Sequence, residues 1–436
     1  MHDYLFFQCS LFVVDCNVLK SRECSRTLLL GSSAVQLDGL TGVANDIYWN
    51  TNHLLEGHTM NYRNFGKLDW KVSALGFGAM RLPVIGDDPT AVDTQLAIAM
   101  IRTAIDGGIN YIDTAYPYHG GNSEVVVGKA LQDGYRQRVH LATKMPSWLV
   151  NSQDDMTRYL DEQLHRLDAD HVDLYLLHGL TADRWHHLAS AGVLDWAEAR
   201  IRDGTVGCLG FSFHDTNTVF HEIVDAYDGW SFCQIQYNLL DELTQAGTEG
   251  LRYAASKGLA VVVMEPLRGG KLANPNPSVA KLWESSPTRR SPAEWALDWV
   301  WNHSEVSLLL SGMSTMAQVE QNLLYADASH PDMLSPDEIA LVAQVRDAYN
   351  SLIRVPCTSC RYCMPCPQGV NIPAVFQLIN DGSMFGTMAL QRDKYKVMRA
   401  DNSSVDNCIQ CGLCELACPQ HIAIPQQLAA CAAELG

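Results

Sequence analysis

From Leu75 onward, short apolar runs alternate with longer segments whose apolar residues recur at helical spacing. The short runs have the length of strands and lie at Leu75–Ala79, Tyr111–Asp113, Val139–Thr143, Val172–Leu177, Val206–Ser212, Phe232–Gln236, Ala260–Met264 and Val306–Leu310. Helical patterns between them include Ala91–Ile105, Asp154–Leu167, Thr216–Ala226 and Ser291–Trp301. A strict alternation of strand and helix predicts an α/β fold with a parallel sheet covered by helices.

Eight strands over about 250 residues are the size of a (β/α)8 TIM barrel, which we expect to occupy residues 60–330. A doubly wound open sheet is the structural alternative. No Gly-x-Gly-x-x-Gly follows the first strand, so the dinucleotide-binding signature of that alternative is missing. The barrel is therefore the favoured fold.

The segment after the barrel predicts helices. Ser335-Pro-Asp-Glu338 has the pattern of a capping box, which predicts a connecting helix within residues 331–356. Farther on, Ile372–Ile379 and Met384–Met398 read as short helices rather than strands. We expect residues 357–436 to form a small, mainly α-helical domain. Residues 1–59 show no sustained period, and we expect an extension that contributes nothing to the fold.

Charge and hydropathy exclude two classes of partner. The chain has 436 residues and a formal charge of −18 at pH 7, whereas nucleic-acid binding needs clustered lysine and arginine. It also lacks an apolar run of the roughly 18 residues that a membrane-spanning helix needs. We expect no nucleic-acid partner, no membrane partner and a cytoplasmic location.

Two cysteine runs near the end of the chain carry a strong chemical signal. They read Cys357-Thr-Ser-Cys360-Arg-Tyr-Cys363-Met-Pro-Cys366-Pro367 and Cys408-Ile-Gln-Cys411-Gly-Leu-Cys414-Glu-Leu-Ala-Cys418-Pro419. Three thiolates two residues apart can hold one iron–sulfur cube, while the fourth, followed by proline, reaches the other cube. The runs therefore predict two [4Fe–4S] clusters held by these eight cysteines.

Zinc and disulfides are the alternatives. Four thiolates saturate one zinc ion, so the third cysteine of each run would be surplus in a zinc ribbon. Disulfide scaffolds go with secretion, and nothing here indicates a secreted chain. The first run has two residues before its last cysteine and the second has three, which leaves the partner of Cys366 open.

Four ionisable residues lie at or just beyond the carboxyl ends of predicted strands, where barrels of this kind carry their chemistry. Asp113 closes the second strand and Tyr118 follows in its loop. Lys144 ends the third strand and His178 ends the fourth. A single lysine or histidine is more often a surface or core residue than a catalytic one. Four from successive strand ends all point to the same mouth.

These residues belong to motifs that resemble the aldo-keto reductases. The motifs are Asp113-Thr-Ala-Tyr-Pro-Tyr118, Ala142-Thr-Lys144, Leu176-Leu-His178, Gly210-Phe-Ser212, Gln234-Ile-Gln236-Tyr237-Asn238 and Gly312-Met-Ser-Thr315 to Gln321-Asn322. The whole chain is similar to the branch of that family with a C-terminal ferredoxin-like domain. The resemblance implies hydride transfer between a nicotinamide and a small carbonyl or alcohol.

Carbonyl reduction assigns a role to each member of this tetrad. Tyr118 would give a proton to the forming alkoxide, if its pKa is lowered from about 10 toward neutrality. Lys144 would lower that pKa, and Asp113 would hold the ammonium in place. His178 would hydrogen-bond the substrate oxygen and orient the carbonyl.

The resemblance also implies a nicotinamide site that departs from the family pattern. Its members here are Ser212, Gln234, Met264, Gly312, Gln318 and Asn322. Phe213 stands where the family has asparagine, and Met264 where it has a stacking tyrosine. Residues 308–322 contain no lysine or arginine to hold the 2′-phosphate of NADP. We therefore expect NAD(H) rather than NADP(H). Gly269 and Gly270 could approach a pyrophosphate.

Clusters that carry single electrons must be reconciled with transfer of a two-electron hydride. A flavin or a redox-active substrate is the usual agent that splits the pair, but no flavin signature is visible. The first hypothesis is a reductase whose clusters exchange electrons with a ferredoxin or another redox partner protein. The alternatives are an electron-transfer subunit that uses the barrel mainly as a docking scaffold, and a redox-sensing protein.

Overall fold

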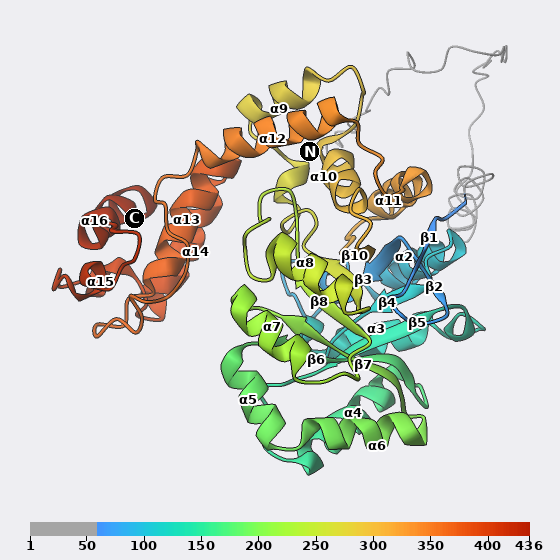
Figure 1. Cartoon of the computed structure of the whole chain (residues 1–436). Coiled ribbons are helices and arrows are strands. Elements are labelled where there is room, and N and C mark those ends of the chain that lie inside the picture. The colour runs from blue at the N-terminus through green and yellow to red at the C-terminus, as the bar shows by residue number, and fades with distance from the viewer. Residues whose placement is uncertain (1–58) are drawn as a thin grey trace, which may run out of the picture. The chain divides into compact units, whose positions relative to one another are not determined.

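The computed structural model describes residues 59–436, and the predicted extension at the start of the chain lies almost entirely outside them. Eight parallel strands form a closed barrel in the order β10-β3-β4-β5-β6-β7-β8-β9 (Figure 1). Their bounds are β3 Leu75–Gly78, β4 Tyr111–Asp113, β5 His140–Met145, β6 Val172–Leu180, β7 Val206–Phe213, β8 Phe232–Gln236, β9 Ala260–Met264 and β10 Val306–Ser311. The predicted TIM barrel is confirmed, and the open-sheet alternative is wrong.

Helices follow the strands around the barrel (Figure 1). They are α2 Thr94–Asp106, α3 Asn122–Ala130, α4 Gln153–Leu167, α5 Ala182–Ser190, α6 Val193–Asp203, α7 Asn217–Asp225, α8 Gly247–Ser256, α9 Pro277–Glu284, α10 Pro292–Trp301 and α11 Met316–Ala328. In α4, Ser152 caps the first turn, and the buried Met156, Leu160 and Leu167 lie on the face that packs inward. Short 3-10 turns occur at η1 Ala79–Arg81, η2 Tyr118–Gly121, η3 Arg136–Arg138, η4 Lys271–Ala273 and η5 Val405–Asn407.

A two-stranded antiparallel hairpin, β1 Tyr62–Asn64 and β2 Lys71–Ser73, precedes the barrel. Its Phe65 is fully buried and packs against Tyr111 and Phe232, at ring-centroid distances of 6.1 and 5.5 Å. These rings join the apolar side chains that fill the barrel interior. The hairpin therefore closes the amino-terminal opening, and the polar strand-end residues face the other opening.

Helices also form the C-terminal region. They are α12 Pro336–Asn350, α13 Ile372–Phe385, α14 Met388–Ala400, α15 Leu413–Leu416 and α16 Ile424–Leu435. The capping box that begins α12 is present, as the sequence predicts. Gly386 has a φ of 66° and ends α13, so the two helices of the spacer are separated by a turn. Their apolar faces form one core around Phe376, Ile379 and Tyr395.

The loop after β9 contacts this helical region. Lys271 Nζ lies 2.7 Å from Asp381 Oδ2 on α13. Asn276 Nδ2 donates to the carbonyl of Met384 at 2.7 Å. No helix within residues 59–436 combines the length and the apolar character needed to cross a membrane.

Candidate functional site

Asp113 and Lys144 form a buried ion pair at the carboxyl ends of β4 and β5. Lys144 Nζ lies 2.5 Å from Asp113 Oδ1 and donates to the carbonyl of Thr114 at 2.8 Å. The other carboxylate oxygen of Asp113 accepts from Gln234 Nε2 at 3.2 Å. Parallel pairing of β4 with β5 brings the two strand ends together. The carboxylate therefore fixes the ammonium in one position.

Tyr118 and His178 lie beside this pair. Lys144 Nζ is 5.0 Å from the centroid of the Tyr118 ring. The Tyr118 and His178 rings meet edge to face at 6.0 Å, and the His178 ring lies 5.2 Å from that of Trp148. The structure thus brings all four predicted tetrad residues to one mouth. Trp148, 43% exposed, lines the same mouth.

Burial and charge act against each other on the ion pair. Burial raises the pKa of the Asp113 carboxyl, although Lys144 and the hydrogen bond from Gln234 oppose the rise. Burial lowers the pKa of the Lys144 amine, but Asp113 and Tyr118 more than offset it, so the net shift is upward. Lys144 therefore carries its charge at neutral pH.

The expectation for Tyr118 needs correction. Burial raises the pKa of its phenol above the usual value, and this outweighs the opposing effect of Lys144. The predicted shift toward neutrality is therefore wrong for the free chain, because the desolvation of the ring was not visible in the sequence. Burial, with Lys144, His214 and Arg184, holds the pKa of His178 well below its usual range. A neutral imidazole keeps one N–H to donate.

Three of the predicted nicotinamide residues lie on β7, β8 and β9, which are neighbours in the barrel. Ser212 and Gln234 are buried, and Met264 is half-buried. Ser212 Oγ accepts from the Gly179 amide at 2.7 Å, which leaves its hydroxyl proton free to donate. Phe213 packs on Phe220 at 5.1 Å, so it belongs to the core behind the strand.

The other three lie at the loop after β10 and at α11. Asn322 Nδ2 donates to Ser311 Oγ at 2.9 Å, and Gln318 Oε1 accepts from the Ser314 amide at 2.8 Å. Both side chains therefore hold the loop itself. Gly312 is exposed.

Arg81 is a basic residue of this loop region that the sequence analysis missed. A Cβ at Gly312 would lie 3.2 Å from Arg81 Cδ, and one at Gly269 would lie 3.1 Å from Arg81 Nη2. The Arg81 side chain thus runs from the loop after β10 to the loop after β9. The two basic residues of the loop after β9 each lie near a carboxylate. Lys271 pairs with Asp381, and Arg268 lies 3.6 Å from Asp241. Arg81 lies near Gly312 because β3 pairs with β10, which brings together the segments that follow these two strands.

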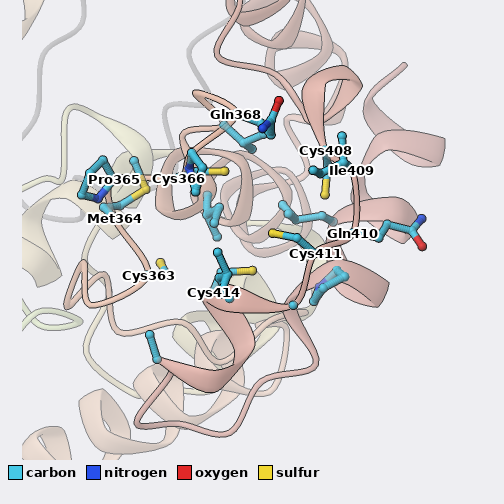
Figure 2. Close-up of a pocket in the computed structure, with 18 of the residues that line it drawn as sticks. Cys363, Met364, Pro365, Cys366, Gln368, Cys408, Ile409, Gln410, Cys411 and Cys414 are labelled. Carbon is cyan, nitrogen blue, oxygen red and sulfur yellow. The ribbon is translucent and has the colours of Figure 1, made fainter.

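The eight predicted cysteine ligands line two cavities. The larger, of about 140 Å³, is lined by Cys363, Cys366, Cys408, Cys411 and Cys414. Figure 2 shows the sulfurs of Cys366, Cys408, Cys411 and Cys414 gathered around one space. Cys366 belongs to the first run by sequence, yet it faces the thiols of the second.

The smaller cavity, of about 20 Å³, is lined by Cys357, Cys360, Cys363 and Cys418. Here the last cysteine of the second run joins the first three of the other. The larger cavity therefore offers three thiols of the second run together with Cys366 and Cys363 of the first, and the smaller offers three thiols of the first run and one of the second, with Cys363 bordering both. No group of three histidine, cysteine or acidic side chains in residues 59–436 is placed to hold a single metal ion. The arrangement, in which the last thiol of each run joins the thiols of the other, matches the ligand pattern of two cubane clusters.

Comparisons with known proteins match both the barrel and the C-terminal cysteine-containing region. A family model described as the aldo/keto reductase family matches residues 74–347. A second model, described as a 4Fe–4S dicluster domain, matches residues 356–423.

Several relatives cover the barrel. L-galactose dehydrogenase of Arabidopsis thaliana is 30% identical over 60% of this chain and 86% of its own length. Methylglyoxal reductase YeaE of Escherichia coli is 28% identical over 63% of this chain and 91% of its own. The holo form of aldo-keto reductase AKR11C1 from Bacillus halodurans has a TM-score of 0.57 at 30% identity, covering 66% of this chain and 96% of its own.

A structure of an aldo-keto reductase from Klebsiella pneumoniae in complex with NADPH has a TM-score of 0.54 at 25% identity, covering 66% of this chain and 95% of its own. The expected preference for NAD(H) therefore finds no support among the structural neighbours. Its premise was also incomplete, because Arg81 supplies a cation that the β10 loop itself lacks.

Proposed function

Because the chain belongs to the aldo/keto reductase family and carries a 4Fe–4S domain, we propose that it reduces a small carbonyl compound by hydride transfer at the mouth of its barrel. The observation that supports this most is the buried Asp113–Lys144 pair beside Tyr118 and His178. A scaffold that served only for docking would have no need to bury two charges at this point, since burying them is costly.

The residues divide the reaction between them. His178 donates a hydrogen bond to the carbonyl oxygen and orients it, and Tyr118 gives that oxygen a proton as it becomes an alcohol. Lys144 stabilises the phenolate that remains, and Asp113 keeps the ammonium in place. A bound reduced nicotinamide would supply the hydride to the carbonyl carbon, and two clusters would carry single electrons. Ser212 and Gln234 would hold the nicotinamide carboxamide.

An anaerobic assay of iron-loaded protein tests this proposal. NADPH and NADH would each be offered with a panel of aldehydes and ketones, and the alcohol product would be measured. We expect nucleotide oxidation matched by alcohol formation. A protein that oxidises neither nucleotide with any carbonyl, yet passes electrons through its clusters, would favour the electron-transfer subunit instead.

We propose that cluster ligation is crosswise, with Cys366 completing the site of the second run and Cys418 that of the first. Cys366→Ser is then expected to lower the iron content from about eight to about four atoms per chain. Cys366→Ser combined with Cys411→Ala should lose no further iron, because both residues serve one cluster. Cys366→Ser combined with Cys360→Ala should lose nearly all of it.

Iron and sulfide analysis of anaerobically purified protein measures these differences. Cys431→Ser is the matched control, because Cys431 is buried in α16 and lines neither cavity. The reverse pattern, in which Cys366 and Cys360 act on one cluster, would contradict crosswise ligation.

Arg81 is proposed to bind a phosphate of the nucleotide. Its guanidinium lies between the β9 and β10 loops and has donors to spare for an anion. We expect Arg81→Gln to weaken the binding of NADPH and NADH by about tenfold each if Arg81 contacts the pyrophosphate they share. Loss confined to NADPH would instead place Arg81 at the 2′-phosphate.

Fluorescence titration with each nucleotide measures this effect. Arg202→Gln, which removes a 69% exposed arginine on α6, controls for a general loss of positive charge. Unchanged affinity for both nucleotides in Arg81→Gln would remove Arg81 from the site.

A further inference from the structure

Two basic residues, Arg184 and His214, lie next to the tetrad, around Gly179. Arg184 Nη1 donates to the carbonyl of Gly179 at 2.6 Å. A Cβ built on Gly179 would lie 3.0 Å from the same nitrogen and 3.7 Å from His214 Cδ2. Gly179 directly follows His178, so the Arg184 guanidinium and the His214 imidazole, whose pKa burial lowers, both border the residue that orients the carbonyl.

The same arginine faces the mouth. Its guanidinium carbon lies 5.6 Å from the centroid of the exposed Trp148 ring, and that ring lies 5.2 Å from the His178 ring. Arg184, Trp148 and His178 are thus successive neighbours along the edge of the opening. A substrate whose carbonyl reaches His178 would have its next few atoms beside Trp148 and Arg184.

Arg184 has donors that no carboxylate of the described chain uses. It forms no ion pair within residues 59–436, and one of its five N–H groups is engaged by the Gly179 carbonyl. The carboxylate of Asp215 accepts from the amides of Ala182 and Thr216, which commits it to the start of α5 and α7. The charge of Glu265 acts on His214, where it raises the imidazole pKa and opposes the larger lowering caused by burial. Among the described residues, the Arg184 guanidinium at the opening therefore has no carboxylate as a counter-ion.

We propose that Arg184 and His214 form an anion subsite beside His178, and that the carbonyl substrate carries a carboxylate. This rests on the proposed carbonyl reduction and names the class of its substrate. The planar fork of a guanidinium matches a carboxylate with two parallel hydrogen bonds. His214 borders the same point and adds one more donor. An aldehyde or ketone acid would thus bind by its carboxylate at Arg184 and by its carbonyl at His178.

A matched pair of substrates tests the subsite. 4-Oxobutanoate and butanal have the same chain length, and only the first carries a carboxylate. We expect kcat/KM to favour 4-oxobutanoate in the wild-type protein. In Arg184→Gln the ratio of the two kcat/KM values should fall about tenfold, since charge-assisted hydrogen bonds are lost. Arg184→Lys should recover only part of it, because lysine keeps the charge without the fork.

Arg202→Gln is the control for net charge and should leave the ratio as it is. Glyoxylate, with its carboxylate next to the carbonyl, reports how far the anion must lie from the reacting carbon. A phosphate-bearing aldehyde, glyceraldehyde 3-phosphate, shows whether the subsite takes the other common anion. An equal ratio in wild type and Arg184→Gln would overturn the subsite while leaving carbonyl reduction intact.

Binding gives a readout that does not depend on turnover. Butanoate, titrated calorimetrically into the nucleotide-loaded protein, should bind the wild type about tenfold more tightly than Arg184→Gln. Failure of the protein to reduce either aldehyde, with butanoate binding still dependent on Arg184, would contradict the reductase proposal and retain the subsite. Butanoate binding that ignores Arg184 would overturn the subsite.

Discussion

Tyr118→Phe is expected to lower kcat/KM for carbonyl reduction by about 10²–10⁴-fold, the usual contribution of a positioned proton donor. Phenylalanine keeps the ring that packs beside His178 and removes only the hydroxyl that would protonate the product oxygen. Nucleotide binding should persist, because Tyr118 is not among the residues assigned to the nucleotide. Steady-state reduction of a carbonyl that the wild type accepts measures the loss.

Tyr116→Phe is the matched control. The hydroxyl of Tyr116 donates to Glu162 at 2.9 Å and its ring lies under Arg166, away from the tetrad. Its removal should leave reduction close to that of the wild type. Near-wild-type turnover by Tyr118→Phe would show that the proton comes from another group.

The raised pKa of Tyr118 also fixes the sign of a pH effect. Reduction needs the protonated phenol, and burial raises the pKa of this phenol above its ordinary value of about 10. Loss of that proton should therefore not limit reduction as the pH rises through the neutral range. The reverse reaction needs the phenolate, so alcohol oxidation should rise with pH over the same range.

Asp113→Ala is expected to destabilise the barrel by about 3–5 kcal/mol, because it leaves the Lys144 ammonium buried without its counter-ion. Both side chains are almost fully buried, at 1% and 4% exposed. Adding Lys144→Met to Asp113→Ala should recover a large part of the loss, since the unpaired charge is then gone. Urea unfolding followed by tryptophan fluorescence gives the free energy of unfolding for each variant.

A surface pair provides the comparison. Lys257 lies 2.7 Å from Asp225, with side chains 46% and 49% exposed. Asp225→Ala should lower the free energy of unfolding far less than Asp113→Ala does, because water already screens that pair. An equal decrease in the free energy of unfolding for Asp113→Ala and Asp225→Ala would mean that the buried pair contributes no more to stability than the surface pair.

The strand pattern predicted the barrel well because a parallel sheet covered on both faces requires continuous apolar runs. Each of the eight predicted strands has its counterpart in the barrel. The strand ends were predicted less well: β5 continues to Met145 and β6 to Leu180, so Lys144 and His178 lie inside their strands rather than at the last residue. Strand order predicted that the four side chains share one opening, since successive parallel strands end there, whereas their assignment as a tetrad came from the family resemblance.

The cysteine-proline pattern predicted that the last thiol of each run reaches the other run, and the lining of the two cavities agrees with this. The shorter gap before Cys366 left its partner open, and the fold places it with the second run. Spacing describes the local turn around each thiol. It does not report how two loops some forty residues apart approach each other, which depends on the helical core between them.

Arg81 and Arg184 were missed for a different reason. Their positions depend on where a long side chain points after the strand has ended. Arg81 reaches Gly312 only because β3 pairs with β10 to close the barrel. The net pKa shift of Tyr118 was misjudged for a related reason, because burial is a property of the whole fold.

Hydride transfer to the carbonyl carbon is the central claim, and isotope transfer tests it most directly. NADPH carrying deuterium at the transferable position of its nicotinamide would be mixed anaerobically with iron-loaded protein and a carbonyl substrate, and the alcohol analysed by mass spectrometry. Direct transfer predicts one deuterium on the former carbonyl carbon of each product molecule. Alcohol formed without deuterium would show that the electrons arrive singly through the clusters and the hydrogen from water, which contradicts the proposed role of the barrel.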